Sequence, residues 1–283
     1  MTVHPETIEL ELRHGLVCGQ VWGNPQGEPV LALHGWLDNS SSFARLAPLL
    51  KSYRVVAVDL PGHGWSDHRP ADTSYLFLHW VRDVFEIAAV LKWDSFILLG
   101  HSMGAAIASM AAGTFPERIN KLVLLEGLGP AVDPEEKIAE GLRAWIEQDL
   151  GEQREERPVY KSASFVAQRL RAKLSDLSEE SSHLLVKRGL EDVEGGVTWR
   201  ADRRLRGKSP MRLSEKQVHV FLRSIRCPVL LFWAEDGWPF EAQVMRERVD
   251  CVRGLVVKKV EGGHHVHMER QELIAKEIND FLA

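Results

Sequence analysis

A serine lies at the centre of the strongest chemical motif in the sequence. Gly100-His101-Ser102-Met103-Gly104 follows an apolar run, Phe96–Leu99, and precedes a stretch rich in alanine. This is the G-x-S-x-G pattern, in which a sharp turn from a strand into a helix exposes a serine hydroxyl. A hydroxyl is a weak nucleophile at neutral pH, so a base must accept its proton and an acid must orient that base. The motif therefore predicts nucleophilic catalysis by Ser102.

Three histidines near the end of the chain compete for the role of the base. They occur in Gly263-His264-His265-Val266-His267, directly after the last apolar run. His264 follows a glycine pair and precedes by five residues Glu269, where the final helix is expected to begin. We predict His264 as the base, with His265 as the alternative and His267 in a packing role. A metal site is the other interpretation, and the absence of a nearby cysteine or aspartate disfavours it.

The acid has two candidates. Glu126 follows the apolar run Leu122–Leu125, and Asp236 follows the run Val229–Trp233. The carboxyl ends of parallel strands meet at one edge of a sheet, where catalytic groups gather. The residues by themselves leave both carboxylates open.

Two backbone N–H groups are candidates for an oxyanion hole. The Met103 N–H lies at the start of the predicted helix, whose positive dipole end favours a developing anion. The Trp36 N–H follows His34-Gly35, which ends an early apolar run. We predict that both groups face the oxygen that becomes charged.

The elements that must position these residues alternate between strands and helices. Thr7–Leu12 and Leu16–Trp22 alternate polar and apolar residues, which predicts an antiparallel hairpin. Fully apolar runs, typical of strands in a parallel sheet, are Val30–Leu33, Val55–Val58, Phe96–Leu99, Leu122–Leu125, Val229–Trp233 and Leu255–Val260. Helical spacing occurs in Tyr75–Leu91, Met103–Phe115 and Gln271–Leu282. This alternation predicts right-handed βαβ units.

Residues 129–214 interrupt this rhythm. The interval shows no convincing strand and is densely charged, as in Glu152–Arg157. Leu142, Trp145 and Ile146 recur at amphipathic spacing, so we predict a mostly helical insertion. The basic run Arg203–Lys208 is expected to be a solvated face rather than a phosphate site.

The composition narrows the class of protein. The chain has 283 residues, of which 45% are hydrophobic and 27% charged, with a net charge of −5. These values are ordinary for a globular protein and exclude collagen, disordered and disulfide-scaffold classes. No basic field suggests nucleic acid as a partner, and no run reaches the ~18 apolar residues of a membrane helix. Three widely spaced cysteines favour a reducing compartment, so we expect a cytoplasmic location.

Together these motifs resemble the α/β-hydrolase superfamily. His34-Gly35, Asp59–Ser66, the serine turn and Gly263-His264 occur in the superfamily's order, and residues 31–43 look most like its serine hydrolase-like subgroup. The resemblance implies an α/β fold: a mostly parallel eight-stranded sheet flanked by helices, with a helical lid inserted after the sixth strand. The catalytic core would comprise residues 1–128 and 215–283, and the cap residues 129–214. Asp59–Ser66 would be a structural loop.

The resemblance also bears on the choice between the two candidate acids, Glu126 and Asp236. Superfamily members commonly place the acid three residues after a glycine that ends the seventh strand. In this sequence Ala234 occupies the position of that glycine and Gly237 occupies the position of the acid. Asp236 therefore lies one residue before the expected position. Some members take the acid from the end of the sixth strand, where Glu126 lies. We therefore favour Glu126.

A serine at this turn, rather than the aspartate of related epoxide- and halide-processing enzymes, indicates acyl transfer. We expect a carboxylesterase that forms an acyl-enzyme on Ser102 and needs no metal or organic cofactor. The alternatives are a cofactor-free perhydrolase, a C–C bond hydrolase, and a binding module without activity. A small hydrophobic ester is the expected partner. Its expected pocket is lined by His34, Gly35, Trp36, Phe43, Trp145 and Trp238. No oligomeric state is predicted.

Overall fold

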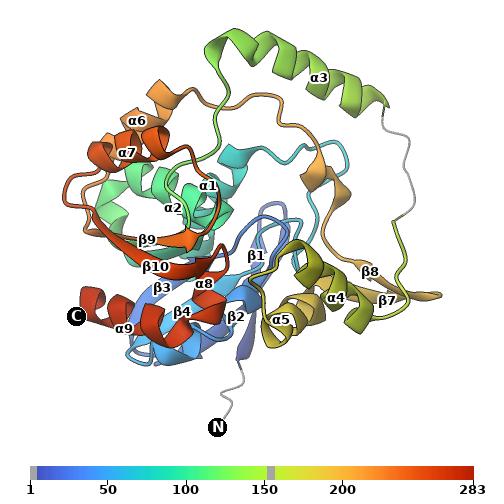
Figure 1. Ribbon diagram of the computed structural model, residues 1–283, viewed down its shortest axis with the longest axis horizontal. Coiled ribbons are helices and arrows are strands. Elements are labelled where there is room, and N and C mark those ends of the chain that lie inside the picture. Colours follow the sequence, from blue (N-terminus) through green and yellow to red (C-terminus); the bar gives the residue numbers. More distant parts are fainter. Residues whose placement is uncertain (1–4, 152–156) are drawn as a thin grey trace.

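A sheet of eight strands forms the centre of the protein (Figure 1). The computed structural model describes residues 5–151 and 157–283, so the charged run Glu152–Glu156 lies outside the described residues. In order across the sheet the strands are β1 (Glu6–Leu12), β2 (Gly15–Gly23), β4 (Tyr53–Val58), β3 (Glu28–Leu33), β5 (Phe96–His101), β6 (Ile119–Leu125), β9 (Val229–Asp236) and β10 (Val256–Gly263).

The sheet is antiparallel at one side and parallel elsewhere. β1 and β2 form the predicted hairpin, and β2 also pairs antiparallel with β4. The remaining strands pair in parallel. This order confirms the predicted α/β-hydrolase fold. Most strands extend one to three residues beyond their apolar runs, because the backbone ladder continues after the side chains leave the core.

Helices cover both faces of the sheet, as Figure 1 shows. One face packs against α1 (Phe77–Val90), α2 (Met103–Thr114), α6 (Glu215–Ser224) and α7 (Ala242–Cys251). The other packs against α9 (Gln271–Leu282), and the short α8 (Val266–Glu269) lies near it. The 3-10 helices are η1 (Ser40–Phe43), η2 (Ala47–Leu49), η3 (Pro116–Arg118), η4 (Glu135–Lys137) and η5 (Arg203–Arg206).

This two-sided cover explains the continuous apolar runs. In β5, Phe96 and Leu98 belong to the core on the α1–α2 side, whereas Ile97 and Leu99 belong to the core on the α9 side. Successive side chains of a strand point to opposite faces, so a strand buried on both sides must be apolar at every position.

Residues 129–214, which we call the inserted segment, connect β6 to α6. It contains α3 (Ile138–Gly151), α4 (Ala163–Lys173) and α5 (Glu179–Gly189). It also contains a hairpin of β7 (Leu190–Val193) and β8 (Gly196–Trp199), which corrects the expectation that it has no strand. Each strand has only four residues, too short for a clear alternation. The turn depends on Gly195 and Gly196, which have φ angles of 85° and 149°.

Hydrogen bonds attach the inserted segment to loops of the sheet. The Arg188 guanidinium on α5 donates to both carboxylate oxygens of Asp59, which follows β4, at 3.0 and 2.8 Å. The Asn39 amide, after β3, donates to the Leu185 carbonyl at 2.8 Å. The segment is therefore fixed against loops at the carboxyl ends of parallel strands.

The basic run Arg203–Lys208 contributes to the same attachment. The Arg204 guanidinium pairs with Asp202 at 2.7 Å and donates to the backbone carbonyls of Pro70 and Thr73. Leu205 is buried. Arg203, Arg206 and Lys208 are exposed, in line with the expected solvated face, whereas Arg204 joins the inserted segment to the loop before α1.

Candidate active site

Ser102 lies in a tight turn between β5 and α2. Its φ and ψ angles are 52° and −115°, a region that residues with a side chain rarely occupy. A Cβ on Gly100 would lie 2.4 Å from the Gly104 carbonyl oxygen, and one on Gly104 would lie 2.0 Å from the Leu33 carbonyl oxygen. The turn therefore requires glycine on both sides of the serine.

His264 follows β10 directly and faces Ser102. Its Nε2 atom lies 2.8 Å from the Ser102 Oγ, and its Nδ1 atom lies 3.2 Å from the Glu126 Oε2. In this arrangement Ser102 donates to Nε2, and Nδ1–H donates to the carboxylate. The ends of β5, β6 and β10 thus bring together the three residues that the sequence favoured. The final helix, α9, begins at Gln271, two residues after the expected Glu269, which instead ends the short helix α8 (Val266–Glu269).

Backbone groups hold the Glu126 carboxylate in place. Glu126 is buried, has a φ angle of 57°, and follows β6. Its Oε1 accepts from the Ala234 N–H at 2.6 Å, and its Oε2 accepts from the Trp238 N–H at 2.9 Å. A Cβ on Gly237 would lie 2.0 Å from Oε2. The missing side chain at Gly237 therefore leaves the space that the Glu126 carboxylate fills.

The alternative acid and base lie elsewhere. Asp236 is exposed at the end of β9, where its backbone pairs with Gly263. His265 is buried, and its Nε2 faces Asp38 Oδ2 at 3.3 Å. His267 is fully buried with Nε2 2.7 Å from the Ser42 Oγ. The structure therefore does not bring Asp236 or His265 to Ser102.

The loop after β3 packs against the beginning of α2. His34 is fully buried: its Nε2 accepts from the Leu60 N–H at 2.9 Å, and its Nδ1–H donates to the Gly35 carbonyl at 2.7 Å. Burial lowers the pKa of His34 to about 4, so the ring is neutral. His34 thus supports the segment that leads to Trp36, and the carbonyl oxygens of Leu33 and His34 lie against Gly104 at the start of α2.

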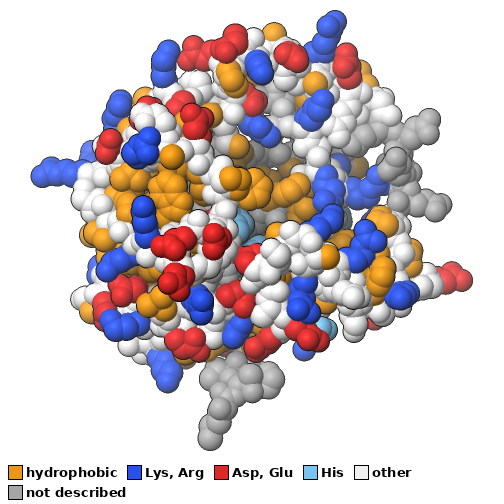
Figure 2. Space-filling model, in the orientation of Figure 1, with side chains coloured by type: hydrophobic (Ala, Val, Ile, Leu, Met, Phe, Trp, Pro, Cys, Tyr) orange, Lys and Arg blue, Asp and Glu red, His pale blue; other side chains and the backbone are white. Residues whose placement is uncertain are grey.

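The expected pocket residues divide into two groups. Trp238 is 58% exposed with its ring centroid 5.5 Å from that of His264, Trp36 is half exposed, and Trp145 is half-buried on α3. In Figure 2 hydrophobic side chains border a central hollow in which histidine atoms are visible. His34 and Phe43, in contrast, are fully buried and line no open pocket. Phe43 packs in the core on the α9 side, near His267, so its placement in the pocket was wrong. Gly35 is also buried, against His101.

Sequence reasoning missed two residues that shape the site. Gly237 makes room for Glu126, as described above. Asp176, in the inserted segment, accepts from the His265 N–H at 3.1 Å and leaves no space for a side chain at Gly263. The only sequence signal for this contact was the glycine pair before His264.

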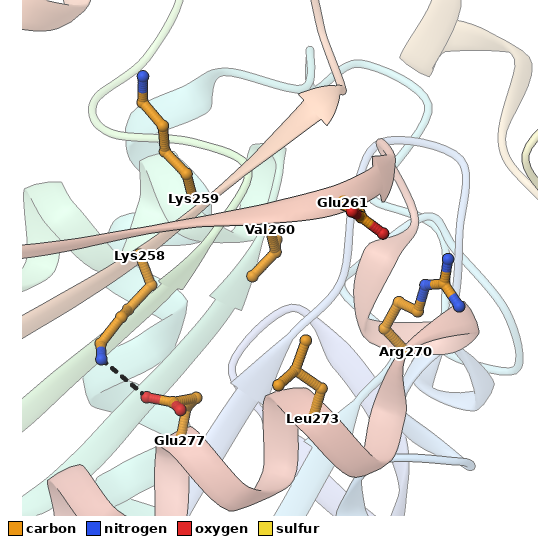
Figure 3. A pocket seen from close by; sticks show the side chains of 7 residues that line it. All are labelled: Lys258, Lys259, Val260, Glu261, Arg270, Leu273 and Glu277. Atoms are coloured by element: carbon orange, nitrogen blue, oxygen red, sulfur yellow. Dashed lines mark ion pairs between the residues drawn. The ribbon is translucent and has the colours of Figure 1, made fainter.

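A separate surface pocket lies between β10 and α9 (Figure 3). Lys258 pairs there with Glu277 at 2.9 Å. None of the residues that line it belongs to the Ser102 site. Its lining mixes both charges and contains no serine, cysteine or histidine, so we do not regard it as a candidate active site.

The fold and the meeting of Ser102, His264 and Glu126 at strand ends define an α/β hydrolase. A sequence model of the family described as alpha/beta hydrolase fold matches residues 28–271, and the chain belongs to this family. Within it the chain belongs to the serine hydrolase-like group. It is 35% identical to a serine hydrolase-like protein of Danio rerio, over 95% of this chain and 85% of that one.

Solved structures agree with this assignment. A hypothetical protein of Pseudomonas aeruginosa superposes with a TM-score of 0.93 at 38% identity, covering 98% of this chain and 99% of that one. A thioesterase domain from the curacin biosynthetic pathway superposes with a TM-score of 0.84 at 28% identity, covering 98% and 99%. Within residues 5–151 and 157–283, no helix is long and apolar enough to cross a membrane.

Proposed function

We propose that this protein hydrolyses carboxylic esters through an acyl-enzyme on Ser102. One observation carries the proposal: His264 lies within hydrogen-bond reach of both Ser102, at 2.8 Å, and Glu126, at 3.2 Å. A nucleophile, a base and an orienting carboxylate in this order are the requirements of acyl transfer.

The reaction follows from the positions of the three side chains. Ser102 Oγ attacks the ester carbonyl carbon while His264 Nε2 accepts the hydroxyl proton, and the Trp36 and Met103 N–H groups bind the oxyanion. The C–O bond then breaks, and His264 returns the proton to the leaving alcohol. A water molecule, deprotonated by His264, attacks the acyl carbon, and Ser102 leaves with the proton. Glu126 stays ionised and stabilises the imidazolium.

The surroundings of Ser102 favour a small hydrophobic ester. Two indoles are exposed, Trp36 after β3 and Trp238 after β9; the Trp238 ring centroid lies 5.5 Å from that of His264, and the hollow of Figure 2 has an apolar border. We assign the inserted segment the role of a cap over this hollow. The three free cysteines, Cys18, Cys227 and Cys251, are compatible with the reducing cytoplasm.

Thioester hydrolysis is the second candidate. The similarity to the curacin thioesterase domain, at 28% identity over nearly the whole chain, favours it. The same relay would act on a thioester, because only the leaving group changes from an alcohol to a thiol.

A covalent probe tests the reaction class. We expect a fluorophosphonate to label the wild-type protein and the Ser224→Ala control, whose exposed serine lies on α6, but not Ser102→Ala. A series of p-nitrophenyl esters from acetate to dodecanoate should show turnover with an initial burst, and Ser102→Ala should lower kcat by about 10⁴-fold or more. Turnover of acyl thioesters alone would support the second candidate. An unreactive Ser102 in folded protein would instead indicate a binding module.

A further inference from the structure

Three side chains from separate loops converge next to His264. Asp38 follows β3, His101 ends β5, and His265 begins the turn after β10. The Asp38 Oδ2 atom lies 3.5 Å from His101 Nδ1 and 3.3 Å from His265 Nε2, and the three atoms lie within 4.8 Å of one another. Both histidines are more than nine-tenths buried, and the Asp38 side chain is partly exposed. Asp38 therefore gives this cluster access to solvent.

The hydrogen positions leave an acceptor unpartnered in the cluster. His101 Nε2 lies 2.9 Å from the His264 carbonyl oxygen, which can only accept, so Nε2 carries a hydrogen. A neutral imidazole carries a hydrogen on only one ring nitrogen, so Nδ1 is then an acceptor. This buried Nδ1 has no hydrogen-bond partner among the described residues. It lies 3.5 Å from the Asp38 Oδ2 atom, and a cation placed between these two acceptors would bind both.

The spacing suits a transition-metal ion. Ligand atoms of tetrahedral zinc lie about 3.4 Å apart, because each bond is about 2.0–2.1 Å long. The measured separations of 3.5 and 3.3 Å are close to this value. Metal-bound histidines also commonly donate their second ring N–H to a carbonyl, as His101 does to His264.

We propose that Asp38, His101 and His265 bind a divalent transition-metal ion such as Zn²⁺, and that the bound ion inhibits the hydrolase. The sequence disfavoured a metal here because no cysteine or aspartate lies near the histidines along the chain; the fold supplies Asp38 from the loop after β3. The second part of the proposal rests on the proposed function. The His264 ring lies 4.9 Å from that of His101 and 5.5 Å from that of His265, centroid to centroid. A cation so close opposes the imidazolium that His264 must form.

A second group of potential ligands serves as a matched control. His14, Asp83 and Glu86 also lie close together. There Asp83 is already neutralised by Arg69, and Arg82 pairs with it at 2.9 Å. These guanidinium groups repel a metal ion, so His14→Gln should not alter binding.

Direct binding tests the site without reference to activity. The full chain is dialysed against Zn²⁺, bound zinc is counted by atomic spectrometry, and the affinity is measured by calorimetry. We expect one ion per chain for the wild type and for His14→Gln. Asp38→Asn and His265→Gln, each checked for folding by circular dichroism, should bind at least about tenfold more weakly. Equal binding by wild type and both site variants, or no binding by folded wild type, overturns the site.

Inhibition is tested separately on the most reactive ester. Zn²⁺ should lower the wild-type kcat at least about tenfold with little change in KM, and a chelator should restore it. Mg²⁺, which prefers oxygen ligands, should have no effect. Asp38→Asn should resist Zn²⁺ relative to its own metal-free rate. If zinc binds but the rate of ester hydrolysis is unchanged, the inhibition is refuted and the metal site is retained. If no ester is cleaved, the proposed function is refuted, and the binding experiment alone tests the metal site.

Discussion

At the scale of single residues, the proposed acid, Glu126, is the most informative member of the proposed relay. Glu126 accepts two backbone N–H groups, from Ala234 and Trp238, besides facing His264. Its carboxylate fills the space left open at Gly237. The Glu126 carboxylate therefore reaches His264 from the end of β6, although the end of β9 and the residues after it supply the N–H groups that hold it.

Replacing Glu126 tests its role directly. Glu126→Gln keeps the size of the side chain but removes the charge that stabilises the imidazolium of His264. We expect kcat for ester hydrolysis to fall about 10³- to 10⁴-fold. Asp236→Asn, which changes an exposed carboxylate, should retain near-normal turnover. The reverse pattern would show that Asp236 is the acid.

Gly237 provides a test of the space around that carboxylate. In Gly237→Ala the new Cβ would lie 2.0 Å from Glu126 Oε2, so the carboxylate must move away from His264. We expect kcat to fall about 10²-fold, the effect of a displacement near 1 Å. Gly151→Ala is the control, because a Cβ there meets nothing within 4 Å. Equal rates for the two variants would contradict the assigned arrangement.

At the scale of elements, one buried ion pair connects the inserted segment to the core. Arg188 on α5 pairs with Asp59 at 2.8 Å, and its guanidinium lies 4.3 Å from the centre of the Trp65 ring. Asp59 also accepts from the Ser40 and Trp65 N–H groups. The Asp59 carboxylate thus connects three elements: the loop after β4, the turn at η1 and helix α5.

Removing the cation should destabilise the protein strongly. Arg188→Met leaves the Asp59 charge buried and uncompensated, so we expect the free energy of unfolding in urea to fall by about 3–5 kcal/mol. Arg143→Met, which breaks an exposed pair with Glu147, should change it by less than about 1 kcal/mol. The double variant Asp59→Asn/Arg188→Met should recover part of the loss. Similar values for Arg188→Met and Arg143→Met would refute the anchoring role.

At the scale of the whole molecule, buried histidines make stability depend on pH. His34 and His63 lie with ring centroids 5.0 Å apart beneath the loops of the site. Burial lowers the pKa of His34 to about 4 and that of His63 to about 3, against an ordinary value of 6.5. Both rings are therefore neutral in the folded protein at neutral pH.

Acidification should therefore favour unfolding. Between pH 6.5 and about pH 4 the unfolded chain binds more protons at His34 and His63 than the folded protein does. The folded state is therefore most stable above this pH range, and its free energy of unfolding falls as the pH decreases through the range. We expect the free energy of unfolding to drop by about 2 kcal/mol per histidine between pH 7 and pH 5. Urea titrations at pH 7, 6 and 5 measure this drop. His34→Gln should show a shallower dependence, and an unchanged slope would argue against His34 as a source.

The fold was largely predictable because its signals are local. Each apolar run of the sheet became a strand, and the glycines around Ser102 marked the turn. The hairpin of β7 and β8 was missed, because four-residue strands carry too little periodicity. Phe43 was misplaced, because an aromatic residue near a motif has the same sequence signature whether it packs in the core or faces a cavity.

The sequence by itself predicted the serine turn, the order of the motifs and the parallel sheet, since these depend on residues adjacent in the chain. Only the tertiary structure shows that Glu126 rather than Asp236, and His264 rather than His265, lies within hydrogen-bond reach of the proposed relay. Those choices depend on distances between atoms from different strands, within about 3 Å for a hydrogen bond. The position of Asp38 also depends on the tertiary structure. Its carboxylate comes close to His101 and His265 only where the ends of β3, β5 and β10 lie at one edge of the sheet.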